Sequence, residues 1–173
     1  MLWVFEYTKY MELFFASHYE IFVRLSIAML CGMIIGAERI LAHKTAGMRT
    51  YALVSMGSAL LVIISQMAGQ LFVKDGSFDP IRMASQVVVG VGFLGAGLIV
   101  LRDKEVTGLT TASGLWVCAA IGMSAGFGFY GIAFISTLLT LFIFVVLWFI
   151  EQRFKKIIPT IEKKIGDTEE LDS

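Results

Sequence analysis

The chain has 173 residues, of which 57% are hydrophobic and 16% are charged, with 14 acidic and 14 basic side chains. Because about a quarter of the residues of an ordinary soluble domain are charged, this composition excludes that class. The zero net charge also excludes a broadly basic surface for nucleic acid. The length suits one domain, and we therefore expect a single all-α domain with the lipid bilayer as its solvent.

The N-terminal segment 1–18 is apolar and aromatic, with Glu6, Lys9 and Glu12 at steps of three. This pattern predicts a short amphipathic helix in the membrane interface. The segment has neither the basic start nor the cleavage motif of a signal peptide.

Two membrane spans are predicted next, at about 19–37 and 50–73, each long enough for a hydrocarbon core of about 30 Å. Glu20 and Arg24 are four residues apart, so they can pair on one helix face. Gly32 and Gly36 have the spacing of a helix contact. The serines and glutamines of the second span are interpreted as structural, because hydroxyls in membrane helices usually bond their own backbone.

The third span is predicted at about 80–101. Asp79 is suited to cap a helix, with Pro80 at its first position. Arg82 and Gln86 share one face with the glycines that follow, so a polar end leads into a stripe of small residues. The small residues favour a packing interface, whereas the charged end is as consistent with a functional role as with a structural one. The glycines are Gly90, Gly92, Gly95 and Gly97.

The last two spans are predicted at 109–125 and at about 130–150. Gly122 and Gly126 again have contact spacing, and the fifth span is so apolar that we expect it to face lipid. Cys31 and Cys118 lie in apolar runs and are expected to be buried without a disulfide. The segment 151–173 is predicted to be a charged tail outside the five-helix domain 19–150.

Ten lysines and arginines fall on one side of these five spans and four on the other. The positive-inside rule then places the N-terminus outside and the C-terminus in the cytoplasm. Two polar clusters follow, one at each end of the spans. The outer one comprises Glu20, Arg24, Asp79, Arg82 and Gln86, and the cytoplasmic one Glu38, Arg39, Lys44, Arg49, Thr110 and Thr111.

Several ordered motifs resemble the MgtC/SapB family of bacterial membrane proteins. They are GAER at 36–39, KTAGMRT at 44–50, LVSMGSAL at 53–60, DPIR at 79–82, QVVVGVGFLGAG at 86–97 and VTGLTTASGLW at 106–116. The resemblance implies a multi-pass inner-membrane protein linked to low magnesium, to virulence or to acid stress. It also implies that some members regulate other membrane complexes, such as the F-type ATP synthase. Many relatives carry Lys-Pro-Ala-Gly where Lys44 to Gly47 stand, and many carry a further cytosolic domain.

Two classes of function remain. The first is a carrier of a divalent cation or a proton, with ionisable groups bordering a path between glycine-lined helices. Asp79 is the candidate Mg²⁺ ligand, although a single carboxylate supplies few ligands for an ion that prefers several oxygens. The second is a protein that binds and modulates another membrane complex, with Asp79 and Arg82 pairing with Arg24 and Glu20 to fix the packing.

Enzymatic activity is not expected, because no nucleophile has an adjacent base and His18 and His43 are isolated in the sequence. We expect no cofactor beyond Mg²⁺ as a ligand or substrate. The glycine faces leave surface that one copy can hardly bury, which predicts a homo-oligomer, most simply a two-fold dimer.

Overall fold

The computed structural model describes residues 2–72, 79–102 and 104–154, and its elements are five α-helices, one π-helical segment and one β-hairpin. This confirms the helical membrane class. The helices are α1 (Leu2–Leu41), α2 (Met48–Phe72), α3 (Pro80–Leu98), α4 (Leu109–Gly126) and α5 (Tyr130–Phe142), and α5 continues through the π-helical segment η1 (Ile143–Leu147).

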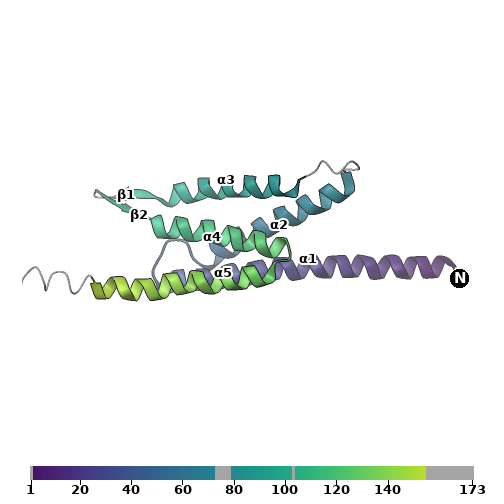
Figure 1. Cartoon of the computed structure of the whole chain (residues 1–173), viewed down its shortest axis with the longest axis horizontal. Coiled ribbons are helices and arrows are strands. Elements are labelled where there is room, and N and C mark those ends of the chain that lie inside the picture. Colours follow the sequence, from purple (N-terminus) through teal and green to yellow (C-terminus); the bar gives the residue numbers. More distant parts are fainter. Residues whose placement is uncertain (1, 73–78, 103, 155–173) are drawn as a thin grey trace, which may run out of the picture.

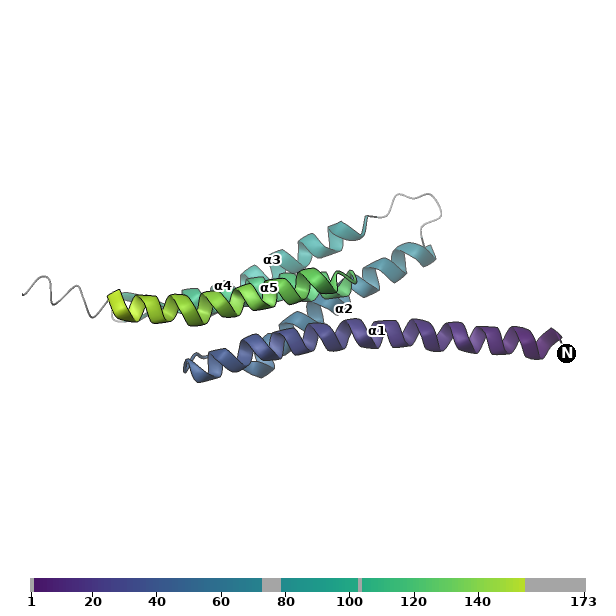
Figure 2. The ribbon, with the colours of Figure 1, turned by 60° about the horizontal axis from the view of Figure 1, so that its bottom comes forward.

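The helices lie side by side, and successive helices run in opposite directions (Figure 1). α1 and α3 lie on opposite sides of the bundle, with α2 and α4 between them, and Figure 2 shows the same order from another direction. The described ends of the chain lie at opposite ends of the molecule (Figure 1). The end of α1, the hairpin and the end of α5 share one end, called here the hairpin end; which side of the membrane it faces stays a prediction.

α4 is the centre of the bundle and contacts all four other helices. Its small residues explain this position, because membrane helices pack by close backbone approach rather than by burying apolar groups against each other. A methyl group at Gly126 would lie 2.7 Å from the Ala59 carbonyl oxygen of α2, and one at Gly122 would collide with the Ser55 carbonyl. These contacts leave no room for a larger side chain.

α1 and α2 approach each other in the same way. A methyl group at Gly32 would lie 2.5 Å from the Tyr51 carbonyl oxygen, and one at Gly36 would lie 2.5 Å from the Met48 Cα. The largest fully buried side chains lie in the core between α1, α2 and α4: Ile35, Tyr51, Val62, Leu115, Cys118 and Ile121. Cys31 and Cys118 are buried and free, as predicted.

Four helices of the described chain are long and apolar enough to cross a membrane: 18–41, 48–70, 109–126 and 130–154. The third predicted span is shorter than expected, because the apolar part of α3 covers only Ala84–Leu98. Since about 20 apolar residues are needed to cross a bilayer, α3 falls short by itself. It nevertheless runs the same course as its neighbours, from one end of the bundle to the other (Figure 1).

The N-terminal region differs from the prediction of two separate helices. Residues 2–41 form one continuous helix, without a break near His18, and its N-terminal part projects beyond the other helices (Figures 1 and 2). The placement of segment 1–18 at headgroup level stays a prediction.

The third span was predicted to continue to about residue 101, but the chain instead forms a β-hairpin between α3 and α4. Strand β1 (Val100–Arg102) pairs antiparallel with β2 (Glu105–Thr107). Gly108 ends the hairpin with φ of +90°, and any Cβ there would collide with the Leu98 carbonyl oxygen, so the turn requires glycine.

α5 was expected to face lipid, but one of its faces is buried in the bundle. Ala133, Thr137, Thr140 and Phe144 are buried at steps of three or four residues, which is one helical stripe. Both threonine hydroxyls donate to carbonyl oxygens four residues earlier, so their polar groups are satisfied within the helix. The predicted tail lies outside the described residues from 155 onward.

Candidate functional site

A buried arginine lies at the hairpin end of α1. Arg39 is only 3% exposed, and it forms an ion pair with the adjacent Glu38 through Nε and Nη2. Its guanidinium carbon also lies 3.5 Å from the centroid of the Phe144 ring. A charge this deep is costly unless it is paired, and here a carboxylate and an aromatic face both compensate it.

Phe144 belongs to η1, where the helix of α5 widens by a π turn. Such turns interrupt the regular register of an α-helix and are frequent at functional sites. Phe144 is buried although Phe142 and Ile143 beside it are exposed. The run from Leu141 to Ile150 is uniformly apolar, so nothing in the sequence distinguished Phe144 from its neighbours.

Tyr51 of α2 completes this region, called here the inner cluster (Glu38, Arg39, Tyr51, Thr111, Gly114, Phe144). Its side chain is fully buried, and its hydroxyl donates to the Thr111 carbonyl oxygen at 3.2 Å. A methyl group at Gly114 would lie 2.6 Å from that hydroxyl oxygen and 2.7 Å from Cζ of Phe144. Side chains from α1, α2 and η1 therefore meet against a glycine of α4.

The structure brings together only part of the predicted cytoplasmic cluster. Glu38, Arg39 and Thr111 are in the inner cluster, whereas Lys44, Arg49 and Thr110 are exposed. Tyr51, Gly114 and Phe144 were not predicted as site residues. Tyr51 was the one with a signal, because a phenol in a membrane span needs a hydrogen-bond partner when it is buried.

A second arginine of α1 organises the other end of the bundle. Arg24 pairs with Glu20 one turn earlier, and its Nη1 donates to the Gln66 side-chain oxygen at 2.9 Å and to the Gly126 carbonyl oxygen at 2.8 Å. We call Glu20, Arg24, Gln66 and Gly126 the outer cluster, a name taken from the predicted orientation and replacing the larger set predicted from the sequence. It ties α1 to α2 and to the last turn of α4, and Glu20 is 58% exposed.

Asp79, Arg82 and Gln86 do not join Arg24 and Glu20, which differs from the predicted pairing. Asp79 accepts a hydrogen bond from the Ile81 backbone N–H at 2.9 Å, which is the expected N-cap of α3. Arg82 and Gln86 are exposed. In the described part of the chain the ion pairs are those of Arg24 and Arg39, and no group of three His, Cys, Asp or Glu side chains is placed to hold a metal ion.

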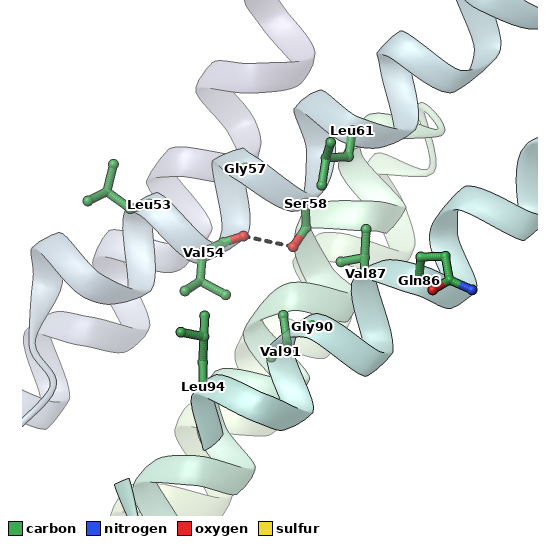
Figure 3. Close-up of a pocket in the computed structure, with 10 residues that line it drawn as sticks. All are labelled: Leu53, Val54, Gly57, Ser58, Leu61, Gln86, Val87, Gly90, Val91 and Leu94. Carbon is green, nitrogen blue, oxygen red and sulfur yellow. Dashed lines mark hydrogen bonds between the residues drawn. The ribbon is translucent and has the colours of Figure 1, made fainter. Parts of the chain in front are cut away.

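Gln86 instead borders a groove between α2 and α3, shown in Figure 3. This α2–α3 groove has a volume of about 470 Å³ and is lined by Leu53, Val54, Gly57, Ser58 and Leu61 of α2 and by Gln86, Val87, Gly90, Val91 and Leu94 of α3. The Ser58 hydroxyl donates to the Val54 carbonyl oxygen at 2.8 Å. The remaining wall is almost entirely apolar.

The glycines of α3 are open, unlike those of α1 and α4. A methyl group at Gly57, Gly90, Gly92 or Gly97 would have no atom within 4 Å, and one at Gly95 would make an ordinary contact with Ala112. Phe93 on the same helix is 83% exposed. Among the described residues, the glycine stripe of α3 therefore packs against the rest of the chain only at Gly95. The predicted role of the other glycines in helix packing requires a partner beyond these residues.

A sequence model of the MgtC family matches residues 25–153. The chain is 44% identical over 126 residues to an Escherichia coli K-12 protein named "Putative magnesium transporter YhiD". The aligned region covers 72% of this chain and 59% of YhiD. Protein SapB of Bacillus subtilis is 39% identical over 150 residues, covering 85% of this chain and 60% of SapB. Protein MgtC of Brucella abortus is 42% identical over 113 residues, covering 65% and 45%. The chain thus spans about 60% or less of these relatives. No solved structure matches it significantly.

Proposed function

The chain belongs to the MgtC family, and from this membership we propose that it is a multi-pass protein of the bacterial inner membrane that serves magnesium homeostasis. The E. coli relative, which is named a putative magnesium transporter, supports the link to magnesium. We further propose that the chain acts by binding another membrane protein and modulating it, rather than by carrying the ion.

The open α2–α3 groove is the observation that carries this proposal. Gly57 and Gly90 lie on its two walls, and a Cβ added at either position would have no atom of the described residues within 4 Å. Exposed glycines let the backbone of another membrane helix approach closely, which is how such helices associate in lipid. A groove walled by glycine and aliphatic side chains therefore fits a transmembrane helix.

The groove is less suited to a hydrated cation. Mg²⁺ is bound by oxygen ligands and keeps several waters. Of the polar groups on the groove wall, the Ser58 hydroxyl is already bonded to its own helix, and Gln86 lies at one end (Figure 3). The two arginine clusters, in turn, have internal partners that tie α1, α2, α4 and α5 together.

A second copy of the chain can use the same face, and we propose that the protein forms a homo-oligomer, most simply a two-fold dimer. An isologous interface of two α3 helices would cover the glycines that one copy leaves open. Cross-linking in native membranes distinguishes this self-association from binding to a different complex.

The test fills the groove without disturbing the fold. Gly90→Leu adds a side chain where the chain itself has open space, and Gly131→Leu does the same on α5 away from the groove. After cross-linking in bacterial membranes and affinity purification, we expect Gly90→Leu to lose a partner that both wild type and Gly131→Leu retain. The F-type ATP synthase is the first complex to look for. Equal recovery from both variants would exclude the groove as the contact surface.

Magnesium transport is the second candidate, favoured by the name of the E. coli relative. Purified protein in liposomes loaded with a magnesium-sensitive dye gives a direct measurement. We expect influx no faster than in protein-free liposomes, under conditions where a known carrier works. Influx above that level which falls in Asp79→Asn would replace the regulatory proposal with a carrier that uses this carboxylate.

A further inference from the structure

A second groove lies between α1 and α2, on the side of the bundle away from α3. It has a volume of about 640 Å³, within the range of about 300–1,000 Å³ that is typical of small-molecule sites. We call it the α1–α2 groove. It is lined by Met29, Met33 and Ile40 of α1, Gly47 of the connecting loop, and Met48, Arg49, Thr50 and Ala52 of α2.

The α1–α2 groove is charged at one end and apolar along the rest. Arg49 and Thr50 are in the first turn of α2, which contains no acidic residue. Neither ion pair in the described part of the chain involves Arg49, whose side chain is exposed. A first helical turn also presents backbone N–H groups and the positive end of the helix dipole. The mouth of the groove is therefore strongly attractive to an anion.

The charged end also lies at the right depth for a lipid headgroup. Arg49 is at the beginning of the membrane span 48–70, so it is near the hydrocarbon boundary. Ile40 and Met29 on the opposite wall are eleven residues apart, which corresponds to about 16 Å along a helix. The apolar wall thus continues from headgroup level well into the hydrocarbon, and two flexible methionines can adapt to an irregular chain.

We propose that the α1–α2 groove binds an anionic phospholipid of the surrounding membrane. Arg49 and the first turn of α2 bind the phosphate, and one acyl chain lies along Met29, Met33 and Ala52. A basic pocket between membrane helices is a recognised form of anionic-lipid site. Unlike the α2–α3 groove, whose walls carry open glycines, this one has a cation at its mouth and so favours a lipid over a helix. The proposal does not depend on which protein the α2–α3 groove binds.

Native mass spectrometry of the full chain in a neutral detergent provides the test, with phosphatidylglycerol and phosphatidylcholine of identical acyl chains as probes. We expect wild type to bind phosphatidylglycerol at least fivefold more tightly than phosphatidylcholine. Arg49→Gln removes most of that preference, and Arg49→Lys retains more of it because the charge remains. Lys104→Gln, which removes one exposed positive charge at the hairpin end but outside the groove, leaves the preference unchanged.

Met33→Trp tests the apolar part of the groove. The larger side chain fills the space of the acyl chain, so we expect binding of both lipids to fall at least fivefold. Each variant must first match wild type in elution profile and unfolding midpoint without lipid, and Arg49→Met, which also removes the charge, takes the place of Arg49→Gln if the latter does not. Equal affinity of wild type for the two lipids, equal losses in Arg49→Gln and Lys104→Gln, or unchanged binding in Met33→Trp would overturn the proposal.

Discussion

The two arginines of α1 each place a positive charge inside the bundle, and different partners stabilise the two charges. Each pairs with a glutamate of its own helix, but Arg39 is buried against the face of Phe144, whereas Arg24 donates to Gln66 and to the Gly126 carbonyl beside a mostly exposed Glu20. The inner cluster depends on a counter-ion, because water does not reach the charge. In the outer cluster the carboxylate is mostly exposed, and the guanidinium has neutral acceptors as well.

Removing the inner counter-ion is expected to have the largest effect. Glu38→Gln leaves Arg39 charged and buried without its carboxylate, and breaking a buried pair in this way costs about 3–5 kcal/mol. Unfolding by SDS in mixed micelles, followed by tryptophan fluorescence, measures the change in free energy. A loss below about 1 kcal/mol would mean that Arg39 is hydrated and that the two clusters do not differ.

Phe144→Leu is expected to cost about 2 kcal/mol, because the substitution removes the aromatic face under a desolvated guanidinium. Phe142→Leu is the matched control, since Phe142 is exposed two residues earlier on the same helix. The same unfolding measurement compares the two variants. Equal destabilisation would show that loss of ring area, and not the contact with Arg39, is responsible.

Gln66→Leu is expected to cost about 1.5 kcal/mol, the lower end for a hydrogen bond to a charged group, because the outer cluster is only partly buried. Gln70→Leu, one turn later and exposed, is the control and should be nearly neutral. If the two glutamine variants unfold alike, Gln66 does not hold Arg24 in place.

Glu20→Gln is expected to have the smallest effect, below about 1 kcal/mol, because an exposed ion pair contributes little. The effect should also decrease as the salt concentration rises, since salt screens exposed charges. A loss as large as that of Glu38→Gln, independent of salt, would contradict the proposed difference between the clusters.

Local spacing made part of this arrangement predictable from the sequence. Glu20 and Arg24 are one turn apart, so their pairing follows from helix geometry, and the N-cap of α3 follows from Asp79 followed by Pro80. The five helices were recognisable because each hydrophobic run is bounded by charged or glycine-containing turns. These features all depend on residues close together in the chain.

Contacts between distant residues were not predictable. Gln66 is 42 residues from Arg24, and Gly126 is 102 residues away, so no local pattern connects them. Phe144 is one of many apolar residues in α5 and η1, and no local pattern marks it as the one that contacts Arg39. Val100, Val106 and Thr107 are β-branched and so favour strands. The hydrophobic run that ends at Leu101 nevertheless favoured a longer third helix.

The unbroken length of α1 has a mechanical consequence. Forty helical residues extend about 60 Å, twice the hydrocarbon thickness of about 30 Å. The N-terminal part of α1 is therefore joined rigidly to the part that carries both arginines. A force that tilts the N-terminal part of α1 also displaces Arg39 at the other end of the helix, because the contacts of Arg24 hold the helix between them. The tilt of the N-terminal part of this helix and the position of Arg39 are therefore mechanically coupled.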